Sequence, residues 1–156
     1  GAFLVDTRKT TPGLRMLEKY AVTCGGGRNH RLGLDNGIML KDNHIAVAGS
    51  ISAAVARAKA HAPILTKIEV ECDTLKQVGE AAKAGADVIM FDNMSAAMMK
   101  KGIALIAGRA KTEASGGINM DTIAEKAESG VDTISVGRMT QSAPAVDIGL
   151  DVSISK

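Results

Sequence analysis

Cationic side chains are concentrated in one stretch near the beginning of the chain, between Asp6 and His44. The stretch reads DTRKTTPGLR, then a mixed run, then GGGRNHRLGLDNGIMLKDNH. Among its cations are Arg8, Lys9, Arg15, Arg28, His30, Arg31 and Lys41. Glycines and turn residues interrupt the stretch, so we expect loops and strand ends to present these side chains. Arginine binds a carboxylate through two parallel hydrogen bonds and lysine binds phosphate as a point charge, so the pattern predicts a site for a small molecule with several negative charges.

Two cationic motifs carry this prediction. Thr7-Arg8-Lys9 follows the apolar run Phe3–Val5, and His30-Arg31 follows three glycines. A solvated basic turn and a packing histidine are the simpler interpretations, but Lys41 repeats the pattern at another expected strand end, which favours ligand binding. The residues that we expect to contact an anionic ligand are Thr7, Arg8, Lys9, His30, Arg31 and Lys41.

Two acidic side chains, Glu71 and Asp92, lie at the ends of neighbouring expected strands. Carboxylates opposite a cationic patch suit Mg²⁺ and ribose hydroxyls, which is the role we favour, and a paired general acid and base is the rival role. Helix capping is the simpler interpretation of Asp92, which precedes Asn93 and Ser95. Glu69 lies on the same strand as Glu71. We expect only one of the two to face the barrel lumen and choose Glu71, because it is nearer the strand end.

Glycine-rich turns end two late strands, at Ser115-Gly116-Gly117 and at Val136-Gly137-Arg138. Bare backbone N–H groups in such turns bind phosphate, and the N-terminus of the following helix adds a favourable dipole. One turn of this kind is weak evidence, because glycine also serves loop geometry. Two at consecutive late strands match the position of the phosphate site in many α/β barrels, so we expect them to bind a phosphate.

Strands and helices are expected to alternate along the chain. We expect strands at Phe3–Val5, Arg31–Leu34, Gly37–Lys41, Ile64–Glu71, Asp87–Phe91, Lys111–Ala114 and Val131–Val136. We expect helices over 14–22 (with Leu14, Leu17 and Val22 on one face), Ile51–Ala60, 73–84 (capped by Asp73), Ser95–Ile106 and Asp121–Ser129. We expect a loop at 41–44 and a mixed helix and strand segment from Gln141 to Lys156.

The expected strands repeat at roughly 20–24 residues, one strand and one helix per repeat, which predicts a parallel sheet with helical crossovers. A doubly wound sheet binds its ligand at a switch point, whereas polar residues here follow strand after strand, which favours an α/β barrel. The 156 residues have room for about six βα units, fewer than the eight of a full barrel. We therefore expect one domain over residues 1–156, an incomplete or open TIM-like barrel.

The composition excludes several classes of function. A net charge of +2 is too small for a nucleic-acid-binding surface, and 2% aromatic residues argue against base stacking. No apolar run approaches the roughly 18 residues of a membrane span. Cys24 and Cys72 are too few for a disulfide framework or a zinc site, which indicates a reducing, cytoplasmic setting, and we expect them, His44 and His61 to be structural. The chain begins with Gly rather than Met, so we expect the later part of a longer polypeptide.

The same motifs, in the same order, resemble those of the quinolinate phosphoribosyltransferases from about residue 6 to residue 151. They are DTRKTTPGLR, GGGRNHRLGLDNGIMLKDNH, IEVEC, MFDN, EASGGI and VDTISVG. The resemblance implies Mg²⁺-dependent transfer of phosphoribosyl from phosphoribosyl pyrophosphate to quinolinate, with loss of CO₂, giving nicotinate mononucleotide and pyrophosphate in NAD biosynthesis. It also implies that the chain corresponds to the family's C-terminal barrel domain without the N-terminal domain, and that the full-length form is a homodimer or higher homo-oligomer.

The resemblance also implies a role for each predicted site residue. The two carboxylates of quinolinate would be held by Arg8, His30, Arg31 and Lys41, with Thr7 and Lys9 beside them. Ribose hydroxyls and Mg²⁺ would be bound by Glu71 and Asp92. The 5′-phosphate would be cradled by Ser115–Gly117 and Val136–Arg138. Catalysis would rest with Lys9, Lys41, Glu71 and Asp92.

Two alternatives to an active transferase of this kind stay open. The chain is either a catalytically silent barrel fragment that binds the substrates, or a related transferase with another anionic acceptor, such as those of molybdenum-transport operons. The intact set of Arg8, His30, Arg31 and Lys41 favours the dicarboxylate. One departure from the family is Gln141, which stands where the family usually has histidine and keeps hydrogen bonding without the positive charge.

Overall fold

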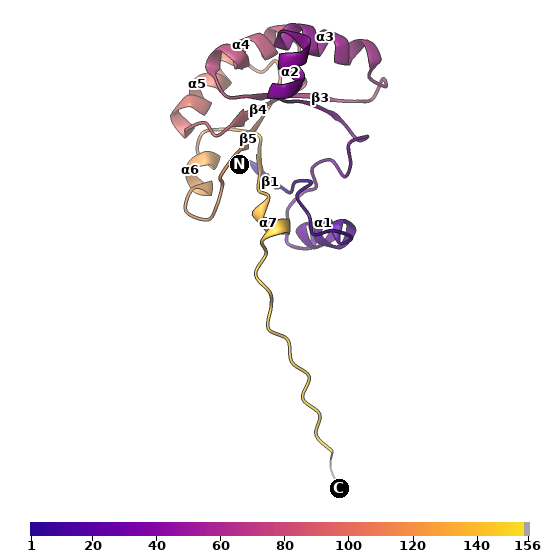
Figure 1. Ribbon diagram of the computed structural model, residues 1–156. Helices are drawn as coiled ribbons and strands as arrows, with labels where there is room; N and C mark the ends of the chain where they lie inside the picture. Colours follow the sequence, from indigo (N-terminus) through magenta and orange to yellow (C-terminus); the bar gives the residue numbers. More distant parts are fainter. Residues whose placement is uncertain (155–156) are drawn as a thin grey trace.

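The computed structural model describes residues 1–154, which form one curved, six-stranded sheet with helices along its outer face (Figure 1). The strands are β1 (Phe3–Val5), β2 (Ile38–Leu40), β3 (Ile68–Cys72), β4 (Val88–Asp92), β5 (Lys111–Ser115) and β6 (Thr133–Ser135). Their order is β1-β6-β5-β4-β3-β2, and all neighbouring pairs are parallel. The first strand pairs with the last, as in a closing barrel, but β1 and β2 are the two edges, so the barrel is open between them. The prediction of an open α/β barrel with about six units is confirmed.

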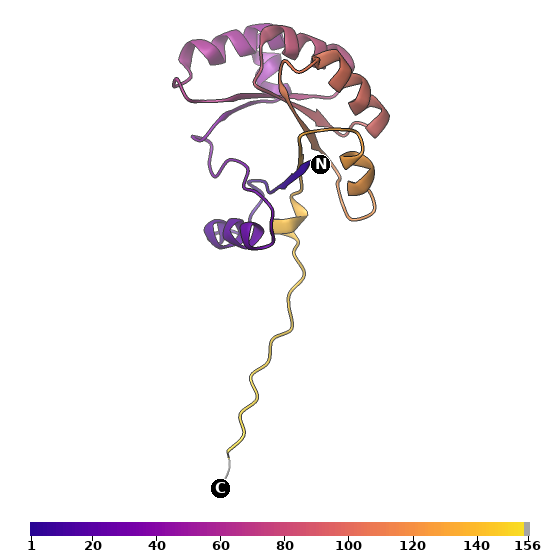
Figure 2. The same cartoon turned by 180° about the vertical axis from the view of Figure 1, so that it is seen from behind.

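Helices α3, α4 and α5 lie on the outer face of this sheet, and α1 lies apart from them (Figure 1). The helices are α1 (Arg15–Cys24), α2 (Asp42–Ala48), α3 (Ile51–His61), α4 (Leu75–Ala84), α5 (Ala96–Ile106), α6 (Ile123–Ala127) and α7 (Arg138–Gln141). Figure 2 shows α3, α4 and α5 side by side along the convex outer face, whereas α1 lies apart from them on the other side. Among the described residues, no helix combines the length and the apolar character that a membrane crossing requires.

The hydrophobic core fills the space between the sheet and its outer helices. Val70, Ile89 and Phe91 on the strands are fully buried there, together with Val78 of α4 and Met99 of α5. Because successive strand residues point to opposite faces, the residues between these apolar positions face the inner side of the curved sheet. The period of two therefore divides each central strand into a packing face and a face that is free for chemistry.

Side-chain caps begin three of the outer helices. The hydroxyls of Ser50 and Ser95 accept backbone N–H groups at the starts of α3 and α5, as expected for these residue types. At α4 the cap is Thr74, and not the predicted Asp73: its hydroxyl accepts the Gln77 N–H, and the Gln77 side chain accepts the N–H groups of residues 73 and 74. The reciprocal capping box satisfies more backbone donors than an aspartate one residue earlier.

A loop replaces one predicted strand and the first part of another. Arg31–Leu34 forms no strand, and the free edge of β1 is instead met by Arg28, through an isolated bridge to Val5. The strand predicted to begin at Ile64 begins at Ile68, because the preceding residues bury nothing: Ile64 itself is 99% exposed. The predicted loop at 41–44 was also wrong, since α2 begins there.

Two further expectations fail near the ends of the chain. Leu14, Leu17 and Val22 do not share a buried face of α1, because Leu17 is 66% exposed while Lys19 is 4% exposed. From Ser142 to residue 154 the chain has no helix or strand and its residues are exposed, so the predicted mixed segment is wrong there, and residues 155–156 lie outside the described part. Figure 1 shows this segment leading away from the barrel.

Candidate active site

The carboxyl ends of all six strands surround one cavity of about 580 Å³. Each strand places a polar residue there, at or next to its end: Asp6, Lys41, Glu71, Asp92, Ser115 and Ser135. Every residue predicted to bind a ligand lines this cavity: Thr7, Arg8, Lys9, His30, Arg31, Lys41, Glu71, Asp92, Ser115–Gly117 and Val136–Arg138. This end of the sheet is where α/β barrels carry their sites. The structure thus brings the predicted residues together, while their individual roles stay predictions.

Two arginines form the cationic wall of the cavity. The buried Nε atom of Arg8 has no hydrogen-bond partner among the described residues. The guanidinium of Arg31 donates to the backbone oxygen of Gly37 (3.3 Å) and contacts the sulfur of Met39 (3.5 Å). Burial, together with the neighbouring charge of Arg8, lowers the pKa of Arg31. Adjacent cations with an unsatisfied buried donor are suited to an anionic ligand.

An ion pair between Lys41 and Glu71 lines the same cavity. The Nζ atom of Lys41 donates to Oε2 of Glu71, which lies on β3. The Lys41 side chain remains 45% exposed, so a ligand in the cavity can reach its ammonium group. The two residues were predicted to serve different substrates. Because they form an ion pair, substituting either one leaves the charge of the other without its partner.

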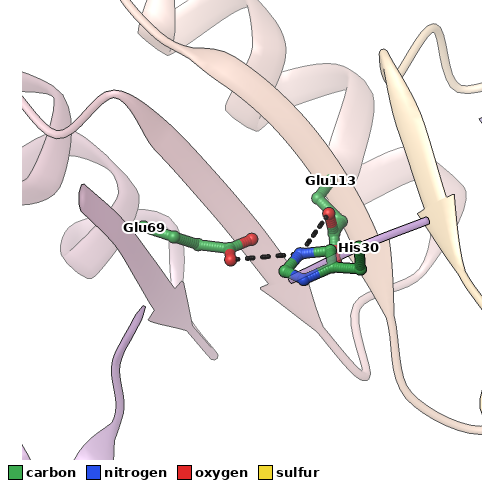
Figure 3. A group of neighbouring side chains, drawn as sticks. All are labelled: His30, Glu69 and Glu113. Carbon is green, nitrogen blue, oxygen red and sulfur yellow. Dashed lines mark ion pairs between the residues drawn. The ribbon is translucent and has the colours of Figure 1, made fainter. Parts of the chain in front are cut away.

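A buried cluster of His30, Glu69 and Glu113 lies on the inner face of the sheet (Figure 3). The His30 Nε2 atom is 3.3 Å from a carboxylate oxygen of Glu69 on β3 and 3.4 Å from one of Glu113 on β5. Hydrogen bonding to Glu113 and then Glu69 raises the pKa of His30 to about 10. Burial also raises the pKa of Glu69. The second oxygen of each glutamate is buried and unpaired within the described residues.

The hydrogen bonds of His30 decide what this cluster is. In the neutral ring, the Arg31 backbone N–H donates to Nδ1 (2.8 Å), which leaves the ring proton on Nε2, between the two carboxylates. This contact opposes protonation of Nδ1, but the two carboxylates outweigh it, so the pKa of His30 is still raised. A metal on Nε2 would have to displace the proton that the carboxylates share. Although the three groups are close enough to hold a metal ion, their arrangement is that of a hydrogen-bonded cluster.

Of Glu69 and Glu71 only Glu71 lines the cavity, as predicted, but the expectation that only one of them faces the barrel lumen is wrong. Both point to the inner side, Glu69 toward His30 and Glu71 toward Lys41. Residues two apart on a strand share a face, so the spacing itself should have placed both on the inner side. The same rule applied to β5 would have found Glu113, which lies two residues before Ser115.

The first glycine turn lies directly beside Asp92. The Asp92 carboxylate accepts a hydrogen bond from the Asn93 side chain (2.7 Å), and the Asn93 N–H donates to the backbone oxygen of Ser115 (3.1 Å). Gly116 has a φ of +90°, and a Cβ there would lie 2.2 Å from the Asn93 side-chain oxygen. Glycine is therefore required both for the backbone conformation and for the close approach of Asn93. Ser95, and not Asp92, caps the following helix, so the capping interpretation of Asp92 is wrong.

The second glycine turn gathers residues from both ends of the chain. A Cβ at Gly137 would lie 3.3 Å from Cδ of Lys9 and 3.6 Å from the side-chain nitrogen of Gln141. The Thr140 hydroxyl donates to the backbone oxygen of Lys9, which ties α7 to the first cationic loop. Lys9 and Gln141 therefore lie together beside this turn.

Comparison with known proteins agrees with this geometry. Residues 1–151 match the family described as quinolinate phosphoribosyl transferase, C-terminal domain. The chain belongs to this family. A probable nicotinate-nucleotide pyrophosphorylase (carboxylating) of Bacillus subtilis (strain 168) is 52% identical over 97% of this chain and 53% of its own length. The nicotinate-nucleotide pyrophosphorylase (carboxylating) of Rattus norvegicus is 42% identical over 94% of this chain and 50% of its own length.

Solved structures of the family share the fold. NadC from Streptococcus pyogenes has a TM-score of 0.91 at 51% identity, covering 94% of this chain and 51% of that one. The nicotinate-nucleotide pyrophosphorylase from Ehrlichia chaffeensis has a TM-score of 0.92 at 43% identity, covering 97% of this chain and 55% of that one. The chain therefore spans about half the length of the relatives it matches.

Proposed function

We propose that the protein transfers the phosphoribosyl group of phosphoribosyl pyrophosphate to quinolinate, with loss of CO₂, in NAD biosynthesis. The observation that carries this proposal is that arginines, lysines, carboxylates and two glycine turns all line one cavity. We take the part around Arg8, Arg31 and Lys41 as its cationic half, and the part around Asp92 and the two glycine turns as its other half. A dicarboxylate and a phosphorylated ribose are the two ligands that these halves suit. Membership of the family supports the same substrates.

Quinolinate would occupy the cationic half. Arg8 and Arg31 would hold one carboxylate each, and the unpaired Nε of Arg8 supplies a donor that is already desolvated. Lys41 would add a point charge at the edge of the cavity. His30 also lines the cavity, and the carboxylates of Glu69 and Glu113 fix its ring there. These contacts would orient the pyridine nitrogen toward the other half.

The phosphorylated donor would occupy the half with the glycine turns. The Ser115–Gly117 and Val136–Arg138 turns would bind its 5′-phosphate through backbone N–H groups. Lys9 would face the pyrophosphate, and Glu71 and Asp92 would bind the ribose hydroxyls and face the anomeric carbon. Negative carboxylates at that point stabilise the positive charge that develops there as pyrophosphate leaves.

The reaction then needs positioning more than a nucleophilic side chain. The nitrogen lone pair of quinolinate forms the bond to the anomeric carbon, while the C–O bond breaks and its electron pair leaves with pyrophosphate. The resulting pyridinium accepts the electron pair of the C–C bond at position 2 as CO₂ departs, and a proton then replaces CO₂. Holding both substrates in line converts a bimolecular encounter into a reaction within one complex.

Mg²⁺ is part of this proposal. Glu71 and Asp92 offer carboxylate oxygens, the ligands that Mg²⁺ prefers in proteins. The ammonium of Lys41 already pairs with the Glu71 carboxylate. Asp92, which is oriented by the Asn93 side chain, is therefore better placed than Glu71 to bind the cation. The donor set therefore fits a cation held mainly by substrate oxygens and one protein carboxylate. When bound, Mg²⁺ would neutralise charge on the departing pyrophosphate.

A homo-oligomer of the full-length form is also proposed. The outward face of α1 exposes Met16, Leu17 and Tyr20, at 68%, 66% and 69%. A cluster of large apolar side chains on a single helix is typical of an interaction surface.

The free thiols of Cys24 and Cys72 agree with a reducing compartment such as the cytoplasm.

The test is calorimetry with each substrate beside a product assay, on this chain and on the full gene product. We expect quinolinate to bind, and Arg8→Ala to weaken that binding by at least about tenfold. Arg57→Ala, on the outer helix α3, is the matched control and should have no effect. Absence of quinolinate binding in the full gene product would overturn the proposal. Binding of both substrates without nicotinate mononucleotide would support the silent fragment, and turnover of another anionic acceptor would support the related transferase.

A further inference from the structure

A buried ion pair between Asp6 and Lys19 lies directly next to the first cationic loop, Thr7-Arg8-Lys9. Asp6 directly follows β1 and is fully buried, and Lys19 on α1 is 4% exposed. The Lys19 Nζ atom is 2.5 Å from Oδ1 of Asp6. Burying two charges removes both from water, and apolar residues of similar volume are often at least as stabilising. A pair kept in this position therefore calls for a role beyond stability.

The ion pair holds the peptide groups on both sides of one site residue. Oδ1 of Asp6 accepts the backbone N–H of His30 (2.8 Å), and Nζ of Lys19 donates to the backbone oxygen of His30 (3.2 Å). The side chain of Asn29 donates to Oδ2 of Asp6 (2.6 Å) and to the backbone oxygen of Lys19 (2.9 Å). The backbone at His30 is thus fixed by two opposite charges and one amide.

The backbone of Asp6 also connects the two cationic loops. Asp6 immediately precedes Thr7-Arg8-Lys9, and its backbone N–H donates to the oxygen of Arg28 (3.2 Å). A second clamp from α1 reinforces the arrangement, because Arg15 donates to the backbone oxygens of Arg8 (3.2 Å) and Leu32 (3.3 Å). One short helix therefore joins the two loops that carry the arginines of the wall.

We propose that the Asp6–Lys19 pair is a positioning device for the acceptor half of the site. Neither charge is free to bind the ligand, since each is occupied by the other and by the backbone of His30. Their effect is to set the distance and orientation between Arg8 and Arg31 before the dicarboxylate binds. Displacements of about 1 Å in such groups are enough to reduce binding and catalysis strongly. The identity of the dicarboxylate as quinolinate rests on the proposed function.

The test compares single and double variants of the pair. Lys19→Met and Asp6→Asn each leave an unpaired buried group, whereas the double variant removes both charges at nearly constant volume. Lys111→Met is the matched control, because Lys111 pairs with Asp132 (2.8 Å) near the opposite ends of the strands. We expect the double variant to bind quinolinate at least about tenfold more weakly and phosphoribosyl pyrophosphate less than about threefold more weakly. Lys19→Arg, which keeps the cation, should restore most of the quinolinate affinity.

A readout without ligand separates this proposal from the proposed function. The imidazole resonances of His30, measured by NMR, should move in the double variant and stay unchanged in Lys111→Met. If the unsubstituted full gene product does not bind quinolinate, the proposed function fails, and the resonances still decide the positioning role. Unmoved His30 resonances in a folded double variant, unchanged quinolinate affinity, or an equal loss of both ligands would each overturn the proposal.

Discussion

The Nε2 atom of His30 lies 3.3 Å from a carboxylate oxygen of Glu69, on the inner side of the curved sheet (Figure 3). Glu113 completes the cluster from β5 at 3.4 Å. The imidazole is therefore directed into the barrel, while its backbone borders the cationic wall. This arrangement makes His30 a link between the barrel interior and the acceptor half of the cavity. The ionisation of His30 should therefore change the free energy of unfolding as pH changes.

Stability should decrease with rising pH because of this cluster. The pKa of His30 is raised to about 10 from its ordinary 6.5, so the native state holds this proton more tightly than the unfolded state. The contribution is full below about pH 6.5 and is lost as pH rises through about 10. The raised pKa of Glu69 acts in the same direction, because the native state again retains a proton longer. Urea unfolding at a series of pH values between 6 and 10 should show the decline.

The variant Glu113→Gln isolates the cause. It removes the larger of the two partners that raise the pKa of His30, so that pKa should fall and the decline in stability with pH should become shallower. Glu125→Gln on α6 is the control, since it changes the net charge equally and does not belong to the cluster. An NMR titration of His30 gives its pKa directly. A histidine that still titrates above pH 9 in Glu113→Gln would contradict the assignment.

The strands with regularly spaced apolar residues and the starts of the outer helices were predictable from sequence. The central strands alternate between core and cavity, and the outer helices begin at serine or threonine, because burial and capping act on neighbouring residues. The buried face of α1 was not predictable in this way. Lys19 is buried because Asp6, 13 residues earlier, needs a cation, and hydrophobic periodicity carries no information on such a pair.

The exposed segment from Ser142 to residue 154 shows a second limit of prediction from local sequence patterns. Val146, Ile148, Leu150 and Val152 alternate with other residues as in a strand, yet each is at least 76% exposed. Alternation indicates that a segment could pair with a sheet, but it does not supply the partner. The strand-end residues of the site were predictable for the opposite reason: a parallel sheet brings all its carboxyl ends to one edge, whatever the loops do.

The ion pair between Lys41 and Glu71 should make their mutational effects non-additive. Lys41→Met should weaken quinolinate binding by roughly 2 kcal/mol, about thirtyfold, by removing a charged donor. Glu71→Gln should mainly lower turnover, because it removes charge facing the anomeric carbon. Since Glu71 also holds Lys41, the double variant should deviate from additivity by about 0.5–3 kcal/mol in quinolinate binding. Calorimetry on the four proteins of the cycle measures the coupling, and strict additivity would show that the pair does not persist in solution.

Gly116 should be intolerant of any side chain, unlike its neighbour. Gly116→Ala places a Cβ 2.2 Å from the Asn93 side-chain oxygen in a backbone with φ of +90°. Gly117 and Gly26 also have positive φ, of +60° and +85°, but nothing lies within 4 Å of a Cβ at either. All three alanine variants should therefore lose about 1 kcal/mol through backbone strain, and Gly116→Ala should lose more. Gly116→Ala should also weaken binding of the phosphorylated donor markedly, because Asn93 and Asp92 must move, whereas Gly26→Ala, outside the cavity, should not; equal effects of these two variants would rule out the steric argument.

Asp92 should determine the response to Mg²⁺. Its carboxylate is oriented by the Asn93 side chain and carries no lysine, in contrast to Glu71. Asp92→Asn keeps the shape and removes the charge, so it should raise the Mg²⁺ concentration needed for half-maximal turnover by about tenfold, while quinolinate affinity changes little. Asp87→Asn, near the opposite end of the same strand, is the matched control and should leave the Mg²⁺ requirement unchanged. Titration of Mg²⁺ at saturating substrates, with calorimetry of quinolinate alone, separates the two quantities. A variant whose quinolinate affinity falls while its Mg²⁺ requirement is unaltered would place Asp92 in the acceptor half of the site instead.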